Sequence, residues 1–329
     1  MATLPKLDPM AVAETGARLR TNIQRAVKVR DEVVRDLLVA LLAEGHVLIE
    51  DYPGVGKTAL ARALARSLGA EYARIQCTVD LLPADVIGTN LFNQRESRFE
   101  FRPGPVFANV VLVDEINRTS PKTQSGLLEC MQERQVTVDK QLHELARPFM
   151  VIATQNPIEY EGTYPLPEAQ LDHFLLRLRV GYPERDDEWR ILERRLDRRT
   201  DEVDLQPVVD RAALLEMQRA IEDVHVGESL GRYIVDVVAE TRTSARLQVG
   251  ASPRGALALL KLARCRAALQ GRDFATPDDV KEIAVPALAH RLTLKPELWV
   301  QRISGDEVVR ETLERVPTPS AEEALRLPE

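Results

Sequence analysis

The residues best suited to chemistry begin at His46, in the stretch HVLIEDYPGVGKTALA. Val47–Glu50 has the apolar character of a short buried strand, and residues 59–68 have that of a helix. Residues 51–58 form a turn between them that contains two glycines. Such glycines let backbone N–H groups turn toward an anion, which also meets the positive end of the helix dipole. The stretch therefore predicts a phosphate-binding loop.

Two side chains of this loop indicate a nucleoside triphosphate. The Lys57 ammonium is expected to reach the β- and γ-phosphates, and the Thr58 hydroxyl to ligate Mg²⁺. Asp51 stands where the usual motif opens with glycine, a position whose role is the least strict of the loop. The expected nucleotide-binding residues are Asp51, Tyr52, Pro53, Gly54, Val55, Gly56, Lys57, Thr58 and Ala59.

A second stretch, NVVLVDEINR, carries two adjacent acids after a continuous apolar run. A strand buried on both faces has such a run, and ligands bind beyond its carboxyl end in open α/β sheets. We expect Asp114 to hold the Mg²⁺ shell, directly or through water. Glu115 is expected to orient and deprotonate the attacking water as a general base.

Two further polar residues follow recognisable element boundaries. Asn156 ends the apolar run PFMVIATQN and is placed to hydrogen-bond the γ-phosphate or the lytic water without adding charge. Arg254 follows Ser252 and Pro253, which begin a helix as its cap and first residue. Arg254 is therefore expected to extend from the first turn of that helix.

The order of elements predicts an α/β fold with a parallel sheet. Two β-hairpins are expected at 88–105 and 135–145, and one helix running into a strand at 168–179. The first hairpin carries exposed aromatics and arginines, so it either contacts a substrate or packs on its own domain. Beyond residue 207 the segments are helical.

The Gly-Tyr-Pro sequence at 181–183 predicts a domain boundary. We expect a nucleotide-binding domain at 1–184, an all-helical domain at 185–316 and a loose tail at 317–329. Beyond Leu294 the chain is rich in proline and glutamate.

Composition narrows the class of protein. The 329 residues carry 44 Lys+Arg and 51 Asp+Glu, a net charge of −7, which argues against nucleic acid as a partner. Three scattered cysteines suit reduced thiols and form neither a disulfide framework nor a zinc pattern. Since no apolar run approaches the roughly 18 residues of a membrane span, we expect a cytoplasmic protein without direct membrane insertion.

Taken together, the motifs resemble those of the AAA+ ATPases, and the residues within and around them resemble those of the MoxR family. The resemblance spans residues 29 to 292. It rests on the segments IEDYPGVGKTALA, FRPGPVFANVVLVDEINRTSPKTQSGLLECMQERQVTV, VIATQNPIEYEGTYPLPEAQLDHFLLRL, GASPRGAL and ATPDDVKEIAVPALAHRL.

This resemblance implies a P-loop AAA+ core with an inserted hairpin, a helical lid and a ring that is commonly a homo-hexamer. It implies ATP and Mg²⁺ as cofactors, and ATP hydrolysis coupled to chaperone-like remodelling or maturation of a protein client. A partner with a von Willebrand A domain is also implied. The matching positions are Lys57 and Thr58 for Walker A, Asp114 and Glu115 for Walker B, Asn156 for sensor 1 and Arg254 for sensor 2.

Two positions depart from the family pattern. The family's Leu-Asp-Arg-Phe, whose arginine reaches a neighbour's γ-phosphate, is matched by Leu-Asp-His-Phe with His173 in that place. Neutral imidazole cannot supply the fixed charge of guanidinium. Either His173 acts as a weak finger, or Arg177, Arg179 or another arginine takes over the finger role, or hydrolysis is slow. Val29 matches a family glycine beside the expected adenine-side loop.

Three functions remain open from the sequence. The first is a ring ATPase in which Lys57 and Arg254 neutralise developing charge, Glu115 positions water, and domain closure by Arg254 acts on a protein client. The second is a DNA-acting AAA+ motor, because Arg95, Arg98 and Arg102 lie on the first hairpin. The third, motivated by His173, is a nucleotide-dependent scaffold with weak hydrolysis.

Overall fold

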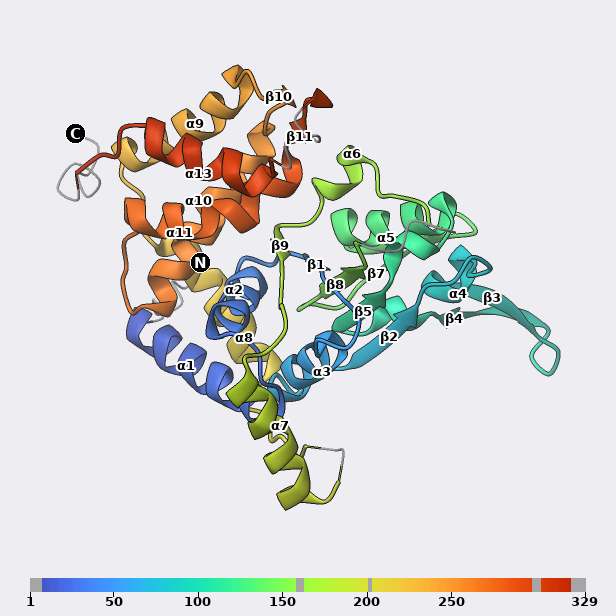
Figure 1. Ribbon diagram of the computed structural model, residues 1–329. Coiled ribbons are helices and arrows are strands. Elements are labelled where there is room, and N and C mark those ends of the chain that lie inside the picture. Colours follow the sequence, from blue (N-terminus) through green and yellow to red (C-terminus); the bar gives the residue numbers. More distant parts are fainter. Residues whose placement is uncertain (1–7, 158–162, 201–202, 298–302, 321–329) are drawn as a thin grey trace, which may run out of the picture.

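A five-stranded parallel sheet lies at the centre of the protein (Figure 1). The computed structural model describes residues 8–157, 163–200, 203–297 and 303–320. The strand order is β2-β5-β8-β1-β9. The strands are β1 (Val47–Glu50), β2 (Tyr72–Gln76), β5 (Val110–Asp114), β8 (Met150–Gln155) and β9 (Leu176–Leu178).

Apolar runs form the inner strands because both faces of the sheet are covered. In β5, alternate residues belong to different parts of the core: Leu112 lies on the face packed by helices of the N-terminal and lid regions, and Val113 on the opposite face. All neighbouring strands pair in parallel. Their carboxyl ends therefore share one edge of the sheet, which we call the carboxyl edge.

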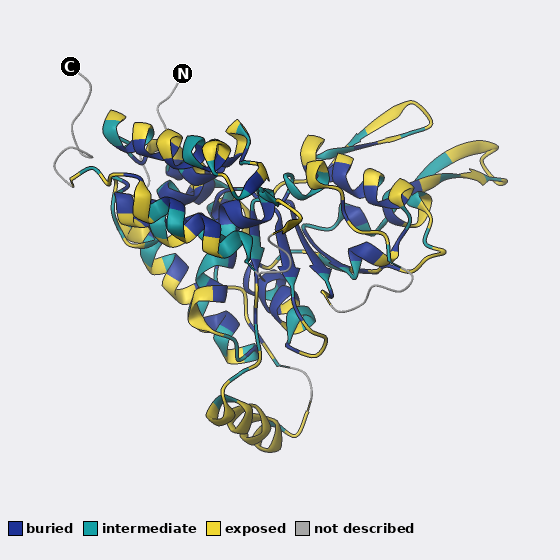
Figure 2. Ribbon diagram, turned by 45° about the horizontal axis from the view of Figure 1, so that its top comes forward, coloured by how far each residue is buried: buried dark blue, intermediate teal, exposed yellow. Residues whose placement is uncertain are grey.

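Helices enclose the sheet on both faces, and their inner sides are buried (Figure 2). The first face of the core includes side chains from α1, α2 and α3, and the second includes side chains from α4 and α5. These helices are α1 (Pro9–Ala26), α2 (Asp31–Leu42), α3 (Lys57–Ser67), α4 (Pro83–Ile87) and α5 (Pro121–Glu133).

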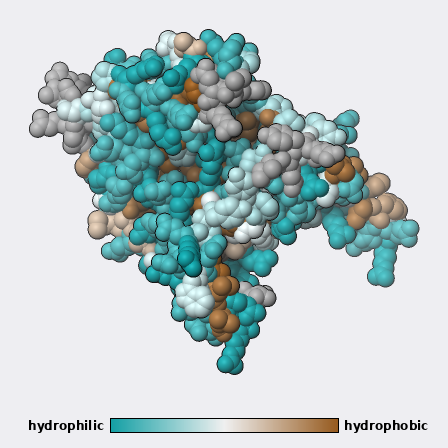
Figure 3. All heavy atoms as spheres, in the orientation of Figure 1, coloured by the Kyte–Doolittle hydropathy of each residue, from teal (hydrophilic) through white to brown (hydrophobic). Residues whose placement is uncertain are grey.

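Both hairpins expected from the sequence are present. The first joins β3 (Gly88–Asn93) to β4 (Arg98–Pro103), and the second joins β6 (Gln135–Val138) to β7 (Gln141–Glu144). The β3–β4 hairpin extends away from the body, with apolar side chains on its surface (Figures 1 and 3). Its base packs on the other hairpin, since the Phe101 ring stacks on His143 with centroids 3.8 Å apart. The base of the hairpin thus packs on its own domain, as one of the two interpretations has it.

A mostly helical region follows the sheet, as expected. Its helices are α7 (Arg185–Arg198), α8 (Arg211–Ala220), α9 (Glu228–Thr243), α10 (Pro253–Leu269), α11 (Pro277–Leu288) and α13 (Gly305–Arg315). One feature was not expected: a short antiparallel pair, β10 (Leu247–Val249) with β11 (Thr293–Leu294). Most of the expected tail, 321–329, lies outside the described residues.

The expected helix running into a strand at 168–179 is present, with a short helical part. The helix α6 (Glu168–Leu171) is followed by a turn at residues 172–173, and the strand β9 begins at Leu176. The peptide carbonyl of Phe174 accepts hydrogen bonds from His290 (2.9 Å) and Arg291 (2.9 Å) of the lid region. These tertiary bonds use a carbonyl that a longer helix would need for its own backbone bonding.

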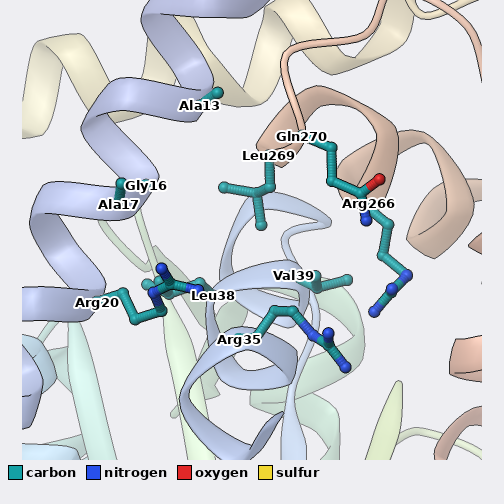
Figure 4. A pocket seen from close by; sticks show the side chains of 10 residues that line it. All are labelled: Ala13, Gly16, Ala17, Arg20, Arg35, Leu38, Val39, Arg266, Leu269 and Gln270. Carbon is teal, nitrogen blue, oxygen red and sulfur yellow. The ribbon is translucent and has the colours of Figure 1, made fainter. Parts of the chain in front are cut away.

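The lid region packs on the core through α10, which meets α1 and α2 around a cavity of about 220 Å³ (Figure 4). Three arginines line this cavity: Arg20, Arg35 and Arg266. Each has an acidic partner, since Arg20 pairs with Asp31 and the other two pair with Asp36 and Glu282. We therefore interpret the cavity as a charge-balanced junction between helices.

No helix among the described residues is long and apolar enough to cross a membrane.

Candidate active site

The phosphate-binding loop lies between β1 and α3, where the sequence predicts it. Gly54 and Gly56 have φ values of 84° and 92°, in the left-handed region that favours glycine. A Cβ on Gly54 would meet nothing within 4 Å, so backbone conformation rather than space requires glycine there. Lys57 is the first residue of α3, and its Nζ donates a 2.8 Å hydrogen bond to the Asp51 carbonyl.

The Asp51 side chain explains why this loop does not open with glycine. Its carboxylate is buried, 5% exposed, and accepts two backbone hydrogen bonds. Oδ1 accepts from the N–H of Tyr52 at 2.8 Å, and Oδ2 from the N–H of Gly181 at 2.6 Å. The carboxylate is therefore turned toward the segment that follows β9. Sequence reasoning placed Asp51 in the loop but missed this partner.

The two acids after β5 are held by one hydroxyl. Thr154 Oγ1 donates to Asp114 Oδ1 at 2.6 Å and accepts from the backbone N–H of Glu115 at 2.9 Å. Thr154 is completely buried. Glu115 has a φ of 57°, a left-handed conformation that a non-glycine residue keeps only when its surroundings hold it. The Asp114 side chain also accepts a 2.7 Å bond from Arg74 through Oδ2.

The Glu115 carboxylate is held on the β2 side of the site. Its Oε2 accepts from Gln76 Nε2 at 3.2 Å and from Arg118 Nη1 at 3.1 Å. Gln76 lies directly beside Asp114 in the sheet register. In this arrangement the carboxylate is positioned by two neighbours that sequence reasoning did not identify.

The loop, the acids and Asn156 share the carboxyl edge. The N–H of Asp51 donates to the Gln155 carbonyl at 3.1 Å, which joins the loop to the end of β8. Asn156, 7% exposed, follows that strand end directly, and β8 lies between β1 and β5. The structure thus brings together three of the four groups that the sequence predicts at the phosphates.

A cavity of about 490 Å³ adjoins the beginning of α3. Its wall includes Thr58 and Ala59 of the predicted loop, and Arg62 and Arg66 from later turns of α3. Open space with positive side chains therefore borders one side of the loop.

The donor set fits Mg²⁺ as an oxygen-liganded ion. Thr58 and Asp114 offer a hydroxyl and a carboxylate, although Arg74 pairs with Asp114 in this structure. Among the described residues, no three His, Cys, Asp or Glu side chains gather as a metal cluster. This agrees with the usual binding of Mg²⁺ by one or two protein oxygens together with substrate phosphates.

The fourth group, Arg254, is not brought to the loop. Its Nη1 lies 3.7 Å from Asp172, which precedes β9. The N–H of Leu175 bonds the His46 carbonyl at the amino ends of β9 and β1, so Asp172 belongs to the opposite edge from the loop. Figure 1 shows α6 and α3 toward opposite ends of the sheet. The expectation that Arg254 reaches the phosphates of its own chain is therefore not met.

Arg254 instead belongs to a charged cluster beside His173. Asp172 accepts hydrogen bonds from Arg291, whose side chain is 3% exposed, and from Ser252. Burial, and next the charge of Arg254, lower the pKa of His173 below its usual value. His173 is thus neutral near pH 7. The strong cations of this cluster are Arg254 and Arg291. Neither stands at the position that matches the family's arginine finger, which is His173.

The matches to protein families cover both regions of the chain. Residues 46–176 match the ATPase family associated with various cellular activities (AAA), and residues 239–312 match the AAA lid domain.

Similar proteins span nearly the whole chain. YeaC of Bacillus subtilis is 48% identical over 93% of this chain and 95% of its own length. Chaperone MoxR1 of Mycobacterium tuberculosis is 40% identical over 94% of this chain and 84% of its own. Protein MoxR of Methylorubrum extorquens is 34% identical over 93% of this chain and 96% of its own length.

A solved structure from Cytophaga hutchinsonii, a proposed ATPase, superposes with a TM-score of 0.89. It is 36% identical, and the match covers 95% of this chain and 97% of the other. The site geometry, the two family matches and these relatives together show that the chain belongs to the MoxR family of AAA ATPases, enzymes that hydrolyse ATP.

Proposed function

We propose that this ATPase remodels or matures a protein client, and that it acts as a homo-hexameric ring. The observation that carries the proposal is the β3–β4 hairpin. Phe92 and Phe99 are 53% and 71% exposed, and their rings contact edge-to-face with centroids 5.3 Å apart. Exposed paired aromatics on a projecting hairpin suit contact with apolar segments of another protein.

The charges on the same hairpin make a DNA motor the less favoured function. Arg98 pairs with Glu96 at 2.5 Å and with Glu100 at 3.0 Å. An arginine bound by two carboxylates is poorly suited to neutralise a phosphate backbone.

Each chain contributes the hydrolytic groups of one carboxyl edge. Lys57 neutralises charge on the β- and γ-phosphates, Asn156 hydrogen-bonds the γ-phosphate, and Glu115 orients the attacking water and accepts its proton. Thr58 and Asp114 hold Mg²⁺, which supplies further neutralisation of phosphate charge when bound.

The ring completes each site with a cation from the neighbouring chain. Arg254 and His173 lie near the amino ends of β1 and β9, away from their own phosphate loop. Of the two, Arg254 carries the fixed charge, with 54% of its side chain exposed. We therefore assign the finger role to Arg254 acting on the adjacent copy, in place of closure within one chain.

The remaining assignments follow from the sequence and from the family. We propose a cytoplasmic protein with a nucleotide-binding domain at 1–184, a lid domain at 185–316 and a loose tail at 317–329. A partner with a von Willebrand A domain is proposed as the client's adaptor. Chaperone MoxR1, the relative at 40% identity, supports a chaperone-like activity.

The client proposal is tested with α-casein as a permanently unfolded probe. Casein should raise the ATPase rate of the parent protein, and the Phe92→Ala/Phe99→Ala variant should lose this stimulation while retaining its basal rate. Val235→Ala, on an exposed position of α9, is the matched control. Stimulation by duplex DNA and not by casein would favour the DNA motor instead.

The ring is tested by mixing two inactive variants. Glu115→Gln removes the base from its own site, and Arg254→Ala removes the finger from the neighbour's site. A mixture contains interfaces that join an intact Glu115 to an intact Arg254, so activity should reappear on mixing. No recovery, or full activity of Arg254→Ala alone, would contradict an intermolecular finger.

A further inference from the structure

The residue that replaces glycine at the start of the phosphate loop also holds the segment leading to α7. Asp51 accepts the Gly181 N–H at 2.6 Å, as described above. One residue further on in each segment, the rings of Tyr52 and Tyr182 stack with centroids 5.6 Å apart and an interplanar angle of 14°. A charge-assisted hydrogen bond and a ring contact therefore link two segments 130 residues apart.

The end of β9 is held from the other side by Arg30, at the beginning of α2. Its Nη2 donates to the Arg179 carbonyl at 2.7 Å, and its Nε to the Val180 carbonyl at 3.3 Å. Gly181 follows with a φ of 73°, a conformation that lets the chain turn sharply toward α7. The connector, defined here as residues 181–184, thus begins at a fixed point and turns at a glycine.

The connector leads into a helix whose side chains are all at least partly exposed. None of the fourteen residues of α7 is buried (Figure 2). Trp189, Leu192 and Leu196 form an exposed apolar stripe on it (Figure 3). Arg194 hydrogen-bonds the Gln24 carbonyl at the end of α1 at 3.0 Å. A helix with so few buried contacts changes orientation at low cost.

The phosphate end of the link is Lys57. Its Nζ donates to the Asp51 carbonyl in this structure. A bound triphosphate competes for the same ammonium, because charge-assisted bonds to phosphate oxygens are stronger than a bond to a neutral carbonyl. Occupancy of the loop therefore changes the hydrogen bonding of the residue whose carboxylate holds Gly181.

From these contacts we propose that Asp51 is a positioning residue that couples nucleotide occupancy of the loop to the orientation of α7. The proposal rests on nucleotide binding by this loop. On binding, Lys57 turns from the Asp51 carbonyl to the phosphates, the beginning of the loop shifts, and the Asp51 carboxylate transmits this shift to the connector. Glycine in the same place leaves the connector without its partner.

The test measures the distance between α7 and the core by energy transfer between two dyes. The dyes are attached to Lys122→Cys on α5 and Glu193→Cys on α7, both exposed positions, while the three native cysteines are buried. Labelled chains are diluted into unlabelled protein so that transfer occurs within one chain. The probe is a non-hydrolysable ATP analogue at a concentration that saturates each variant.

The parent should show a change in transfer on binding the analogue. Asp51→Gly should bind the analogue but lose that change. Asp51→Asn should keep part of it, because one amide oxygen still accepts a backbone N–H. Asp139→Gly, at a β-turn position with a φ of 49°, is the matched control and should behave as the parent.

Three results overturn the coupling: binding by the parent without a change in transfer, a full change in Asp51→Gly, or equal loss in the Asp139→Gly control. If Asp51→Gly does not fold, Tyr182→Ala decides, because it removes the ring stack and should reduce the change. Failure of the parent to bind the analogue would overturn the proposed nucleotide site itself, a result distinct from binding without movement.

Discussion

Thr154 shows how a single buried hydroxyl sets the geometry of the catalytic acids. The hydroxyl donates to Asp114 and accepts from the Glu115 N–H. These two bonds use the hydroxyl's one proton and one of its two lone pairs. Sequence alone does not identify it, since threonine is an ordinary strand residue. Only the pairing of β8 beside β5 places it against both acids. Asp51 is a similar case, because its partner Gly181 is distant in sequence.

Thr154→Val should lower ATP turnover by about 10- to 100-fold, the usual effect of losing a group that orients a metal-site ligand. The valine has the shape of threonine but leaves the Glu115 N–H without its acceptor. Steady-state phosphate release measures the loss. Thr154→Ser keeps the hydroxyl and should stay near the parent rate, and an equally impaired serine variant would contradict the assigned role.

At the scale of elements, apolar runs predicted β1, β5 and β8, and alternation of apolar with polar residues around a turn predicted both hairpins. Within the expected helix running into a strand at 168–179, tertiary bonds decide where the helix ends. The chain at 172–174 leaves the helix because Arg291 and His290 bind its carbonyls. The β10–β11 pair has two or three residues per strand, too few for a periodic signal.

Asp172→Ala should destabilise the junction between β9 and the lid. The buried Arg291 guanidinium would lose its carboxylate partner, and breaking a buried ion pair costs about 3–5 kcal/mol. Urea-induced unfolding measures the change. Glu228→Ala breaks the exposed pair with Arg232 and should cost about 0.5 kcal/mol or less; equal effects would contradict the burial argument.

His46 joins β8 to the end of α5 and should make stability fall with acid. Burial lowers its pKa from 6.5 to about 4, while Nδ1 accepts from Val151 and Nε2 meets the Met131 carbonyl at 2.9 Å. Between these pH values the unfolded chain binds a proton that the folded chain does not. Stability is thus full above pH 6.5 and declines toward pH 4, by at most about 3 kcal/mol from this residue.

His46→Asn supplies the comparison for this pH dependence. Asparagine keeps an acceptor for Val151 but cannot take up the proton. Its unfolding free energy should be lower at pH 7 and should change less between pH 6.5 and 4. The buried His290, whose pKa is lowered to about 3, retains part of the dependence. An unchanged slope in the variant would show that His46 does not cause it.

On the scale of the whole molecule, one chain holds the two halves of the proposed site, the phosphate loop and Arg254, at opposite edges of its sheet. The sequence motifs identify both halves, but not their placement. That placement depends on the path of the connector and on the packing of α10 against α1 and α2, which no local pattern encodes. For this reason Arg254 does not reach the phosphate loop of its own chain in this structure. In the ring that we propose, neighbouring copies would bring the two halves together.

The most direct test of the account compares ATP binding and turnover in Glu115→Gln with those of the parent. Titration calorimetry measures binding, and phosphate release measures turnover. Lys57→Ala should abolish ATP binding, which shows that the measured binding occurs at the phosphate loop. Glu133→Gln on α5 is the control for losing a carboxylate outside the site. Glu115→Gln should bind ATP and lose turnover by about 100-fold or more. Unchanged turnover in this variant would contradict hydrolysis at the carboxyl edge by Glu115.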